Sequence, residues 1–214
     1  MSSRSTRSQR LKTASSERRE RERQALRETI LAAARRLLLE HGYAGLSLRQ
    51  VAEAIGYTPT TIYLHFADKD DLLFAVIDQA FDQFTRDLEV AYASTPDPAE
   101  RLRALAAAYL AFGRQQPEAY QVIFLQRPDF LLKWKAGSQQ PRANALQFLR
   151  QAVSEAQAAG VVRPGDPLLL SNLIWASVHG AVALAITMPQ LFGAADQEPT
   201  FAAVIEAALR GVAP

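Results

Sequence analysis

The side chains best suited to contact a partner gather in residues 56–66, GYTPTTIYLHF. Threonine hydroxyls can hydrogen-bond to DNA base edges, threonine methyls can pack on the thymine methyl, and a tyrosine hydroxyl suits a phosphate oxygen. A short helix that starts at Pro59 would turn Ile62 and Phe66 towards the core. Its outward positions would then be Thr60, Thr61, Tyr63 and Leu64. The chemistry of this stretch favours a surface that reads DNA.

Two helix start signals position these side chains. Ser47 is a hydroxyl N-cap for a helix over 48–55, and Thr58 is a hydroxyl cap followed by Pro59, a residue favoured at the first helical position. A turn that contains glycine separates the two helices. Short helices joined in this way form a helix-turn-helix, whose second helix enters the major groove. Free N–H groups at the capped helix starts would also suit phosphate.

Helical spacing of apolar residues accounts for the rest of the chain. An apolar face from Leu26 to Leu37 predicts a first helix that ends at His41-Gly42, and Asp68 precedes a long helix. Caps, prolines and apolar faces predict further helices near 98–115, from 117, and over 138–160, 166–188 and 201–209. No stretch alternates with period two for long enough to be a strand. The sequence therefore predicts an all-α protein, with an N-terminal three-helix helix-turn-helix domain and a C-terminal helical bundle.

These elements divide the chain into four segments. They are a flexible basic arm (1–22), a helix-turn-helix DNA-binding domain (23–68), a connecting helix (69–93) and a C-terminal ligand-binding and dimerisation domain (94–214). The arm could add non-specific or minor-groove contacts to DNA. Glu/Arg pairs three and four residues apart within 17–27 are also consistent with a solvated helix face.

Charge is distributed unevenly along the chain. The first 66 residues contain twelve Lys/Arg and six Asp/Glu, whereas the remainder contains twelve and sixteen. The N-terminal part is therefore suited to meet a polyanion.

Composition excludes several classes of protein. The chain has no cysteine, which rules out disulfides, thiolate metal sites and nucleophilic cysteine chemistry. Its three histidines are far apart and no Gly-rich phosphate loop is present, so we expect no enzyme, no metal and no cofactor. The basic N-terminal residues are not followed by an apolar run. We therefore expect no signal peptide and a cytoplasmic protein.

One predicted helix is long enough to span a bilayer. Residues 168–188 carry no formal charge over 21 positions. Polar side chains interrupt this surface, namely Ser171, Asn172, Ser177 and His179. No Lys/Arg cluster anchors the C-terminal end either. We expect a buried core helix or a subunit interface and no membrane contact.

The stretch LSLRQVAEAIGYTPTTIYLHFADKDDLL, residues 46–73, resembles the tetracycline-repressor-like (TetR) family of transcriptional regulators. The resemblance begins near Ile30 and includes a Tyr-x-His-Phe-x-x-Lys signature at Tyr63, His65, Phe66 and Lys69. Family members are all-helical homodimers with an N-terminal DNA-binding domain and a variable C-terminal domain that binds a small ligand.

The family resemblance implies a set of operator contacts. They fall at Ser47, Thr58, Thr60, Thr61, Tyr63 and Lys69. His65 has two interpretations, packing beside Phe66 or direct contact with DNA. Pro59 stands where many relatives carry Lys, which removes one phosphate contact.

A second resemblance lies in the C-terminal part. IWASVHGAVAL is similar to the Trp-x-x-x-His-Gly signature of one C-terminal subgroup of the family, at Trp175, His179 and Gly180. Small-molecule sites are mostly apolar with a few polar groups. The candidates for such a site are Tyr109, Phe112, Tyr120, Phe124, Trp134, Trp175 and His179. The alternative interpretation places these residues in the core. Because helix 168–188 has no Arg or Lys, we expect a small apolar or aromatic effector, neutral or weakly charged.

The sequence as a whole predicts a ligand-responsive transcriptional regulator. We expect a homodimer on a palindromic operator, because two recognition helices about 34 Å apart double the base contacts of one. The residues do not separate a repressor from an activator, although the family resemblance favours a repressor. The alternative function is a helical ligand-binding or adaptor protein with little DNA binding.

Overall fold

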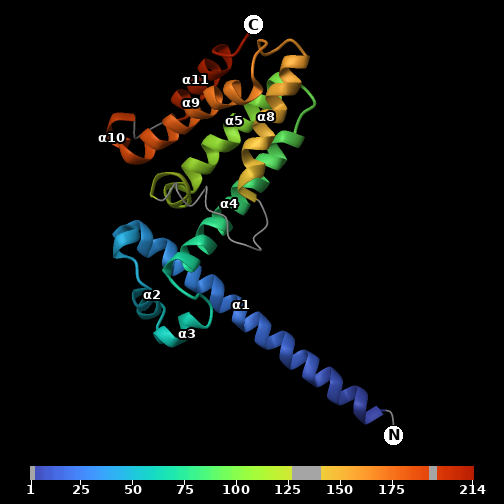
Figure 1. Ribbon diagram of the computed structural model, residues 1–214, viewed down its shortest axis with the longest axis vertical. Helices are drawn as coiled ribbons and strands as arrows, with labels where there is room; N and C mark the ends of the chain where they lie inside the picture. The colour runs from blue at the N-terminus through green and yellow to red at the C-terminus, as the bar shows by residue number, and fades with distance from the viewer. Residues whose placement is uncertain (1–2, 127–140, 193–196) are drawn as a thin grey trace. The chain divides into compact units, whose positions relative to one another are not determined.

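The structure, a computed structural model, describes residues 3–126, 141–192 and 197–214, and this part of the chain contains helices and no strand. The all-α prediction is therefore confirmed. The residues group into two compact units, an N-terminal unit (Met1–Val76) and a C-terminal unit (Ile77–Pro214). The boundary falls within α4 (Lys69–Ala93) (Figure 1).

The N-terminal unit consists of α1 (Ser3–Gly45), α2 (Leu48–Ala54), α3 (Pro59–Tyr63) and the beginning of α4. Each helix contributes apolar residues that are completely or almost completely buried, among them Ile30, Val51, Ile62 and Leu72. The predicted caps are confirmed: the Ser47 and Thr58 hydroxyls accept backbone N–H groups at the starts of α2 and α3. Gly56, with φ of 74°, follows α2 in the left-handed region that favours glycine. The helix-turn-helix is therefore formed as predicted.

The first helix begins much earlier than the sequence analysis predicted. It extends back to Ser3, through the segment 1–22 for which we expected a flexible arm. Ion pairs three and four residues apart accompany this extension, Arg18 with Glu22 at 3.5 Å and Arg23 with Glu20 at 4.0 Å. Such pairs stabilise an exposed helix by a few tenths of a kcal/mol each, roughly 0.2–0.5. Near its other end, α1 is interrupted at Gly42 (φ 65°), close to the predicted end.

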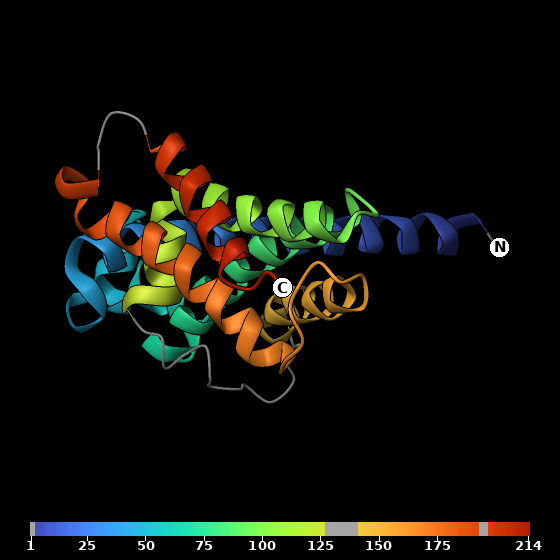
Figure 2. The same ribbon diagram turned by 90° about the horizontal axis from the view of Figure 1, so that it is seen from above.

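The C-terminal unit contains the remaining helices. They are the rest of α4, α5 (Pro98–Gln115), α6 (Pro117–Tyr120), the π-helix η1 (Gln121–Gln126), α8 (Pro141–Ala158), α9 (Pro167–Thr187), α10 (Pro189–Phe192) and α11 (Glu198–Arg210). Within this unit α9 packs against α5, α8 and α11 (Figure 2). The predicted cap-plus-proline starts of α5 and α9 are confirmed, because Asp97 and Asp166 accept N–H groups of the first turns.

The contact between α5 and α9 depends on a glycine. A Cβ atom added at Gly113 of α5 would lie 2.2 Å from Val182 Cγ1 of α9. No side chain fits at that separation, so the absence of a side chain allows the two helices to approach. This crossing places residues of α5 and α9 in one core.

The surface of α9 that faces away from this core carries large apolar side chains beside the polar Asn172 and Ser177. Leu169, Leu173 and Leu184 are 56%, 44% and 45% exposed, and Met188, just after the helix, is 45% exposed. By length and composition alone α9 is able to cross a membrane. Its other face packs in the core of the C-terminal unit, where Ile174, a residue of α9, is almost completely buried.

Candidate DNA-binding and ligand-binding sites

The helix α3 divides its side chains between core and solvent. Ile62 is fully buried, and Phe66, just beyond the helix, is 2% exposed. By contrast, Tyr63 is 58% exposed and Thr60 is also exposed. The buried pair holds the helix to the N-terminal unit, while its outward side chains remain available to a partner, as the sequence predicted.

The hydroxyls of the two caps are already engaged in local hydrogen bonds. Thr58 Oγ1 accepts the Thr61 N–H at 3.4 Å and lies 3.1 Å from Thr61 Oγ1. Ser47 Oγ accepts the Gln50 N–H at 3.3 Å and donates to Gln50 Oε1 at 2.8 Å. The structure thus gives Ser47 and Thr58 a capping role. Thr60 of α3 takes no part in these cap hydrogen bonds.

Lys69 has a partner that the sequence analysis did not identify. Its Nζ donates to the Tyr43 carbonyl oxygen at 3.0 Å and lies 4.0 Å from the centroid of the Tyr43 ring. The Tyr43 hydroxyl donates to a carboxylate oxygen of Asp70. Tyr43 therefore positions the side chain that the family resemblance assigns to operator DNA. No sequence spacing marked Tyr43, which lies 26 residues before Lys69.

His65 is half-buried beside the core of the N-terminal unit. Burial, followed by the positive charges of Arg23 and Arg27, lowers the pKa of His65. The Arg27 guanidinium lies 5.1 Å from the centroid of the neighbouring Phe66 ring. The neutral form of the His65 side chain is therefore favoured. This agrees with packing beside Phe66, and contact of His65 with DNA stays a prediction.

Tyr57 is a further exposed aromatic residue near the recognition helix. It is 48% exposed and lies in the turn between α2 and α3. Its backbone N–H is bonded to the Ala52 carbonyl oxygen at 2.9 Å, so the backbone is fixed while the side chain faces solvent. Tyr57 is not among the operator contacts predicted from the sequence, although its position beside Gly56 was an available signal.

The candidate ligand residues within the described part of the chain form one aromatic cluster. They come from α5, α6, η1 and α9, and are Tyr109, Phe112, Tyr120, Phe124, Trp175 and His179. Phe84 of α4 joins them, with its ring centroid 4.8 Å from that of Phe112. Trp134, the seventh candidate, lies outside the described residues.

Burial separates this aromatic cluster into two groups. Tyr109, Phe112 and Tyr120 are buried, so they belong to the core. Phe124, Trp175 and His179 are partly exposed. Burial raises the pKa of both tyrosines and lowers that of His179, so the cluster is uncharged near neutral pH.

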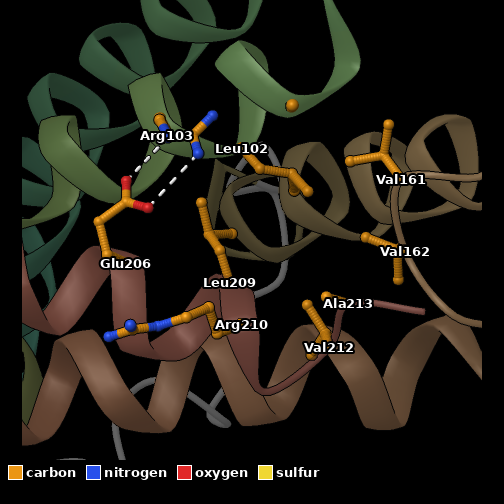
Figure 3. A pocket seen from close by; sticks show the side chains of 10 residues that line it. Leu102, Arg103, Val161, Val162, Glu206, Leu209, Arg210, Val212 and Ala213 are labelled. Carbon is orange, nitrogen blue, oxygen red and sulfur yellow. Dashed lines mark hydrogen bonds and ion pairs between the residues drawn. The ribbon is translucent and has the colours of Figure 1, made fainter.

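Two hollows in the C-terminal unit are lined by residues other than the candidate ligand residues. One of about 270 Å³ is lined by residues that include Gly113, Gln121 and Phe201. The other, of about 160 Å³, has apolar walls that include Leu102 and Val162 and a polar side where Arg103 pairs with Glu206 (Figure 3). Neither is lined by a residue that we named as a ligand contact.

Both the N-terminal and the C-terminal parts of the chain match models of known protein families. Residues 30–76 match the tetR family of bacterial regulatory proteins, and residues 102–208 match the tetracyclin repressor-like C-terminal domain. The second match alone covers half of the chain.

Individual relatives agree with these matches. The HTH-type transcriptional regulator HbdR from Aromatoleum sp. (strain CIB) is 28% identical over 165 residues, which cover 72% of this chain and 70% of HbdR. A solved structure of a protein of unknown function from Rhodococcus sp. RHA1 is 28% identical, with a TM-score of 0.71 over 88% of this chain and 96% of that chain. FadR from Bacillus subtilis, solved with stearoyl-CoA, shares the fold at 20% identity, with a TM-score of 0.70 over 86% of this chain and 98% of FadR. The chain belongs to the tetracycline-repressor family of bacterial transcriptional regulators.

Proposed function

We propose that the protein is a ligand-responsive repressor that binds a palindromic operator as a homodimer, in the cytoplasm and without catalytic activity. The observation that carries this proposal is the helix α3, held to the core by Ile62 and presenting Thr60 and Tyr63 to solvent. A helix of this kind fits the major groove, where threonine can reach base edges and tyrosine can reach phosphate. We assign operator contacts to Thr60, Thr61 and Tyr63, with Lys69 on the phosphate backbone.

The test of DNA binding is selection of duplexes from a randomised library, followed by affinity measurements at several salt concentrations. We expect enrichment of a two-fold symmetric sequence, and a shift in base preference for Thr61→Ala. Binding that is weak and independent of sequence would instead support a helical ligand-binding or adaptor protein.

We propose that α9 forms the subunit interface. Its exposed leucines, Leu169, Leu173 and Leu184, lie within about 60° of one another around the helix, given 100° per residue. A second copy of the chain could cover this stripe through a four-helix interface. The apolar face of 201–209 on α11 is a second candidate for the interface, but Phe201 and Ala208 are buried within the chain's own core. The part of α11 left for a partner carries Ala202, Ala203 and Ala207.

Replacement of Leu173 by glutamate tests this interface. The new carboxylate would lose its hydration in the dimer, so we expect a monomer at micromolar concentration by sedimentation velocity, with loss of operator binding. Val90→Glu is the matched control, because Val90 is 71% exposed on α4, outside the stripe. A Leu173→Glu protein that remained dimeric would remove α9 from the interface.

We propose that the effector binds at the exposed side of the aromatic cluster, near Phe124, Trp175 and His179. These side chains offer aromatic surface and one polar ring, which suits an apolar or aromatic molecule. The stearoyl-CoA in the FadR structure has an extended apolar part of this kind. Membership of the Trp-x-x-x-His-Gly subgroup remains part of this proposal.

The proposed switch runs through α4, which begins at Lys69 in the N-terminal unit and continues into the C-terminal unit. An effector releases DNA only if it binds more tightly to a dimer whose recognition helices are wrongly spaced, and the coupling is reciprocal. A compound that raises the melting temperature should therefore weaken operator binding. Trp175→Phe, which keeps an aromatic ring, should blunt this response while leaving ligand-free operator binding near the wild-type level.

A further inference from the structure

Four polar side chains are hydrogen-bonded to one another inside the aromatic core of the C-terminal unit. Trp175 Nε1 lies 3.1 Å from the Tyr109 hydroxyl oxygen, and the Tyr109 and Tyr120 hydroxyl oxygens are 3.1 Å apart. His179 Nδ1 lies 2.6 Å from the Tyr120 oxygen and 3.0 Å from the Tyr109 oxygen. Three helices, α5, α6 and α9, contribute to this network.

The chemistry of the groups sets the direction of these bonds. An indole N–H can only donate, so the Tyr109 oxygen accepts from Trp175. Tyr109 then has its own proton for the Tyr120 oxygen or for His179 Nδ1, and Tyr120 has its proton for Nδ1, so Nδ1 accepts in either arrangement. The separation of 2.6 Å between Tyr120 and Nδ1 is shorter than an ordinary N–H···O bond and suits a hydroxyl donor. In the opposite arrangement Nδ1 would donate and Tyr120 would turn to the His179 carbonyl oxygen, at the longer distance of 3.3 Å.

This direction fixes the tautomer of His179. Because Nδ1 accepts, the ring proton of the neutral imidazole resides on Nε2. The imidazole is partly exposed, and no residue in the described part of the chain is hydrogen-bonded to Nε2. Burial lowers the pKa of His179, so the ring stays neutral near pH 7. His179 is thus a neutral N–H donor with a fixed orientation.

We infer that the Trp175–Tyr109–Tyr120 relay holds His179 as the Nε2–H donor for an uncharged acceptor oxygen of the effector, such as the carbonyl of a ketone, ester or thioester. This inference rests on the proposed function of a ligand-responsive regulator and adds the chemical class of the group recognised. The buried tyrosines act through the histidine and position it. A carboxylate would meet a neutral donor rather than a cation, which disfavours an acid as effector.

The tautomer can be measured without any effector. The chain has three histidines, so the full-length protein labelled with ¹⁵N-histidine gives three side-chain patterns in a long-range ¹H–¹⁵N correlation spectrum. His179→Asn identifies the signals of His179. We expect its proton on Nε2 in the wild type, and a mixture of tautomers in Tyr109→Phe/Tyr120→Phe. Tyr92→Phe, which removes a hydroxyl bonded to Glu155 elsewhere in the same unit, should leave the pattern unchanged. A wild-type proton on Nδ1 would overturn the inference.

Recognition of the acceptor is tested with three probes of similar shape: acetophenone, ethylbenzene and benzoate. We expect acetophenone to bind roughly tenfold more tightly than ethylbenzene, the factor for one neutral hydrogen bond, and to shift the His179 Nε2 signal. Equal binding of the first two, or tighter binding of benzoate, contradicts the inference. Binding of none of the three also contradicts it. Operator binding by the same preparation would then leave the regulator function standing, so the two failures are distinguishable.

Discussion

The hydroxyl groups of α3 and those of the aromatic cluster are placed in opposite ways. The Tyr63 side chain is exposed on a short helix, whereas Tyr109 and Tyr120 are buried and hydrogen-bonded to each other. Burial of a hydroxyl without a hydrogen-bond partner is costly, and the C-terminal unit provides a partner for each of these two tyrosine hydroxyls. An exposed hydroxyl is satisfied by water and can exchange that water for DNA. The same residue type therefore serves stability in the C-terminal unit and, under the proposed assignment of Tyr63, recognition in the N-terminal unit.

The largest effect on stability is expected at the close approach of α5 and α9. Gly113→Ala places a Cβ atom 2.2 Å from Val182 Cγ1, so α5 and α9 must separate. We expect the free energy of unfolding to fall by about 1–3 kcal/mol, the usual cost of overpacking. Urea unfolding measures this change.

Gly180→Ala is the matched control for Gly113→Ala. A Cβ atom at Gly180 would meet no atom within 4 Å, and Gly180 lies on α9, the helix that carries Val182. We expect its free energy of unfolding to stay level or to rise by up to about 1 kcal/mol, because Ala has a higher helix propensity than Gly. In addition, Val182→Ala should partly restore the Gly113→Ala protein. Equal effects of the two glycine changes would show that the close approach to Val182 does not determine the loss.

Removal of single hydroxyls tests the comparison between the two units directly. Tyr120→Phe leaves His179 Nδ1 without its shortest hydrogen bond, so we expect a loss of about 1–3 kcal/mol in the free energy of unfolding. Tyr63→Phe removes an exposed hydroxyl and should change that free energy by less than about 0.5 kcal/mol. By contrast, operator affinity should fall more for Tyr63→Phe than for Tyr120→Phe. If Tyr63→Phe bound DNA as well as the wild type, the assignment of Tyr63 to phosphate would be wrong.

The sequence predicted capped helix starts in both units. Caps and prolines are local signals, and Ser47, Thr58, Asp97 and Asp166 are confirmed as caps for that reason. The extension of α1 to Ser3 was not predicted, because exposed Glu/Arg pairs are consistent with either a solvated helix or a flexible arm. Local signals therefore located the capped helix starts, whereas the start of α1, which no such signal marks, was missed.

The candidate sites depended on contacts that are distant in sequence. The hydrogen bonds of His179 to Tyr109 and Tyr120 join residues 70 and 59 positions apart, and no spacing rule connects such residues. Aromatic composition alone identified members of the cluster but could not divide core from exposed surface. The interaction of Lys69 with Tyr43 was missed for the same reason. Outward positions of α3 were predictable because helical periodicity is a local property.

A smaller effect, on DNA affinity, is expected at Lys69. This side chain combines a structural contact with Tyr43 and a predicted contact with phosphate. Its ammonium group is held by the Tyr43 carbonyl oxygen and ring, yet it has three donors and can also reach a phosphate. We expect Lys69→Met to weaken binding to all DNA sequences and to reduce the salt slope of binding by about one unit. Tyr43→Phe keeps the ring and the carbonyl and should leave the slope unchanged. An unaltered slope in Lys69→Met would restrict Lys69 to a structural role.

The smallest effect on the free energy of unfolding is expected from the protonation of two partly buried histidines, His65 and His179. The pKa of His179 is lowered by burial and that of His65 by burial and two arginines. A histidine whose folded pKa lies below its ordinary value of 6.5 binds more protons in the unfolded chain. Stability is therefore retained above about pH 6.5 and lost as the pH falls from there through the lowered pKa.

Single histidine variants separate the two contributions to this pH dependence. His179→Asn can offer Tyr120 an amide oxygen and does not titrate, so its urea unfolding should lose less stability than the wild type between pH 7.5 and pH 5. His65→Asn removes the other contribution in the same way. The carboxylates and the third histidine are present in every protein compared, so their titration cancels in the difference. We expect the larger difference for His179, because its protonation must also break the bond that Nδ1 accepts from Tyr120. Identical pH profiles for His179→Asn and the wild type would mean that Nδ1 already carries a proton at neutral pH, against the direction assigned to the relay.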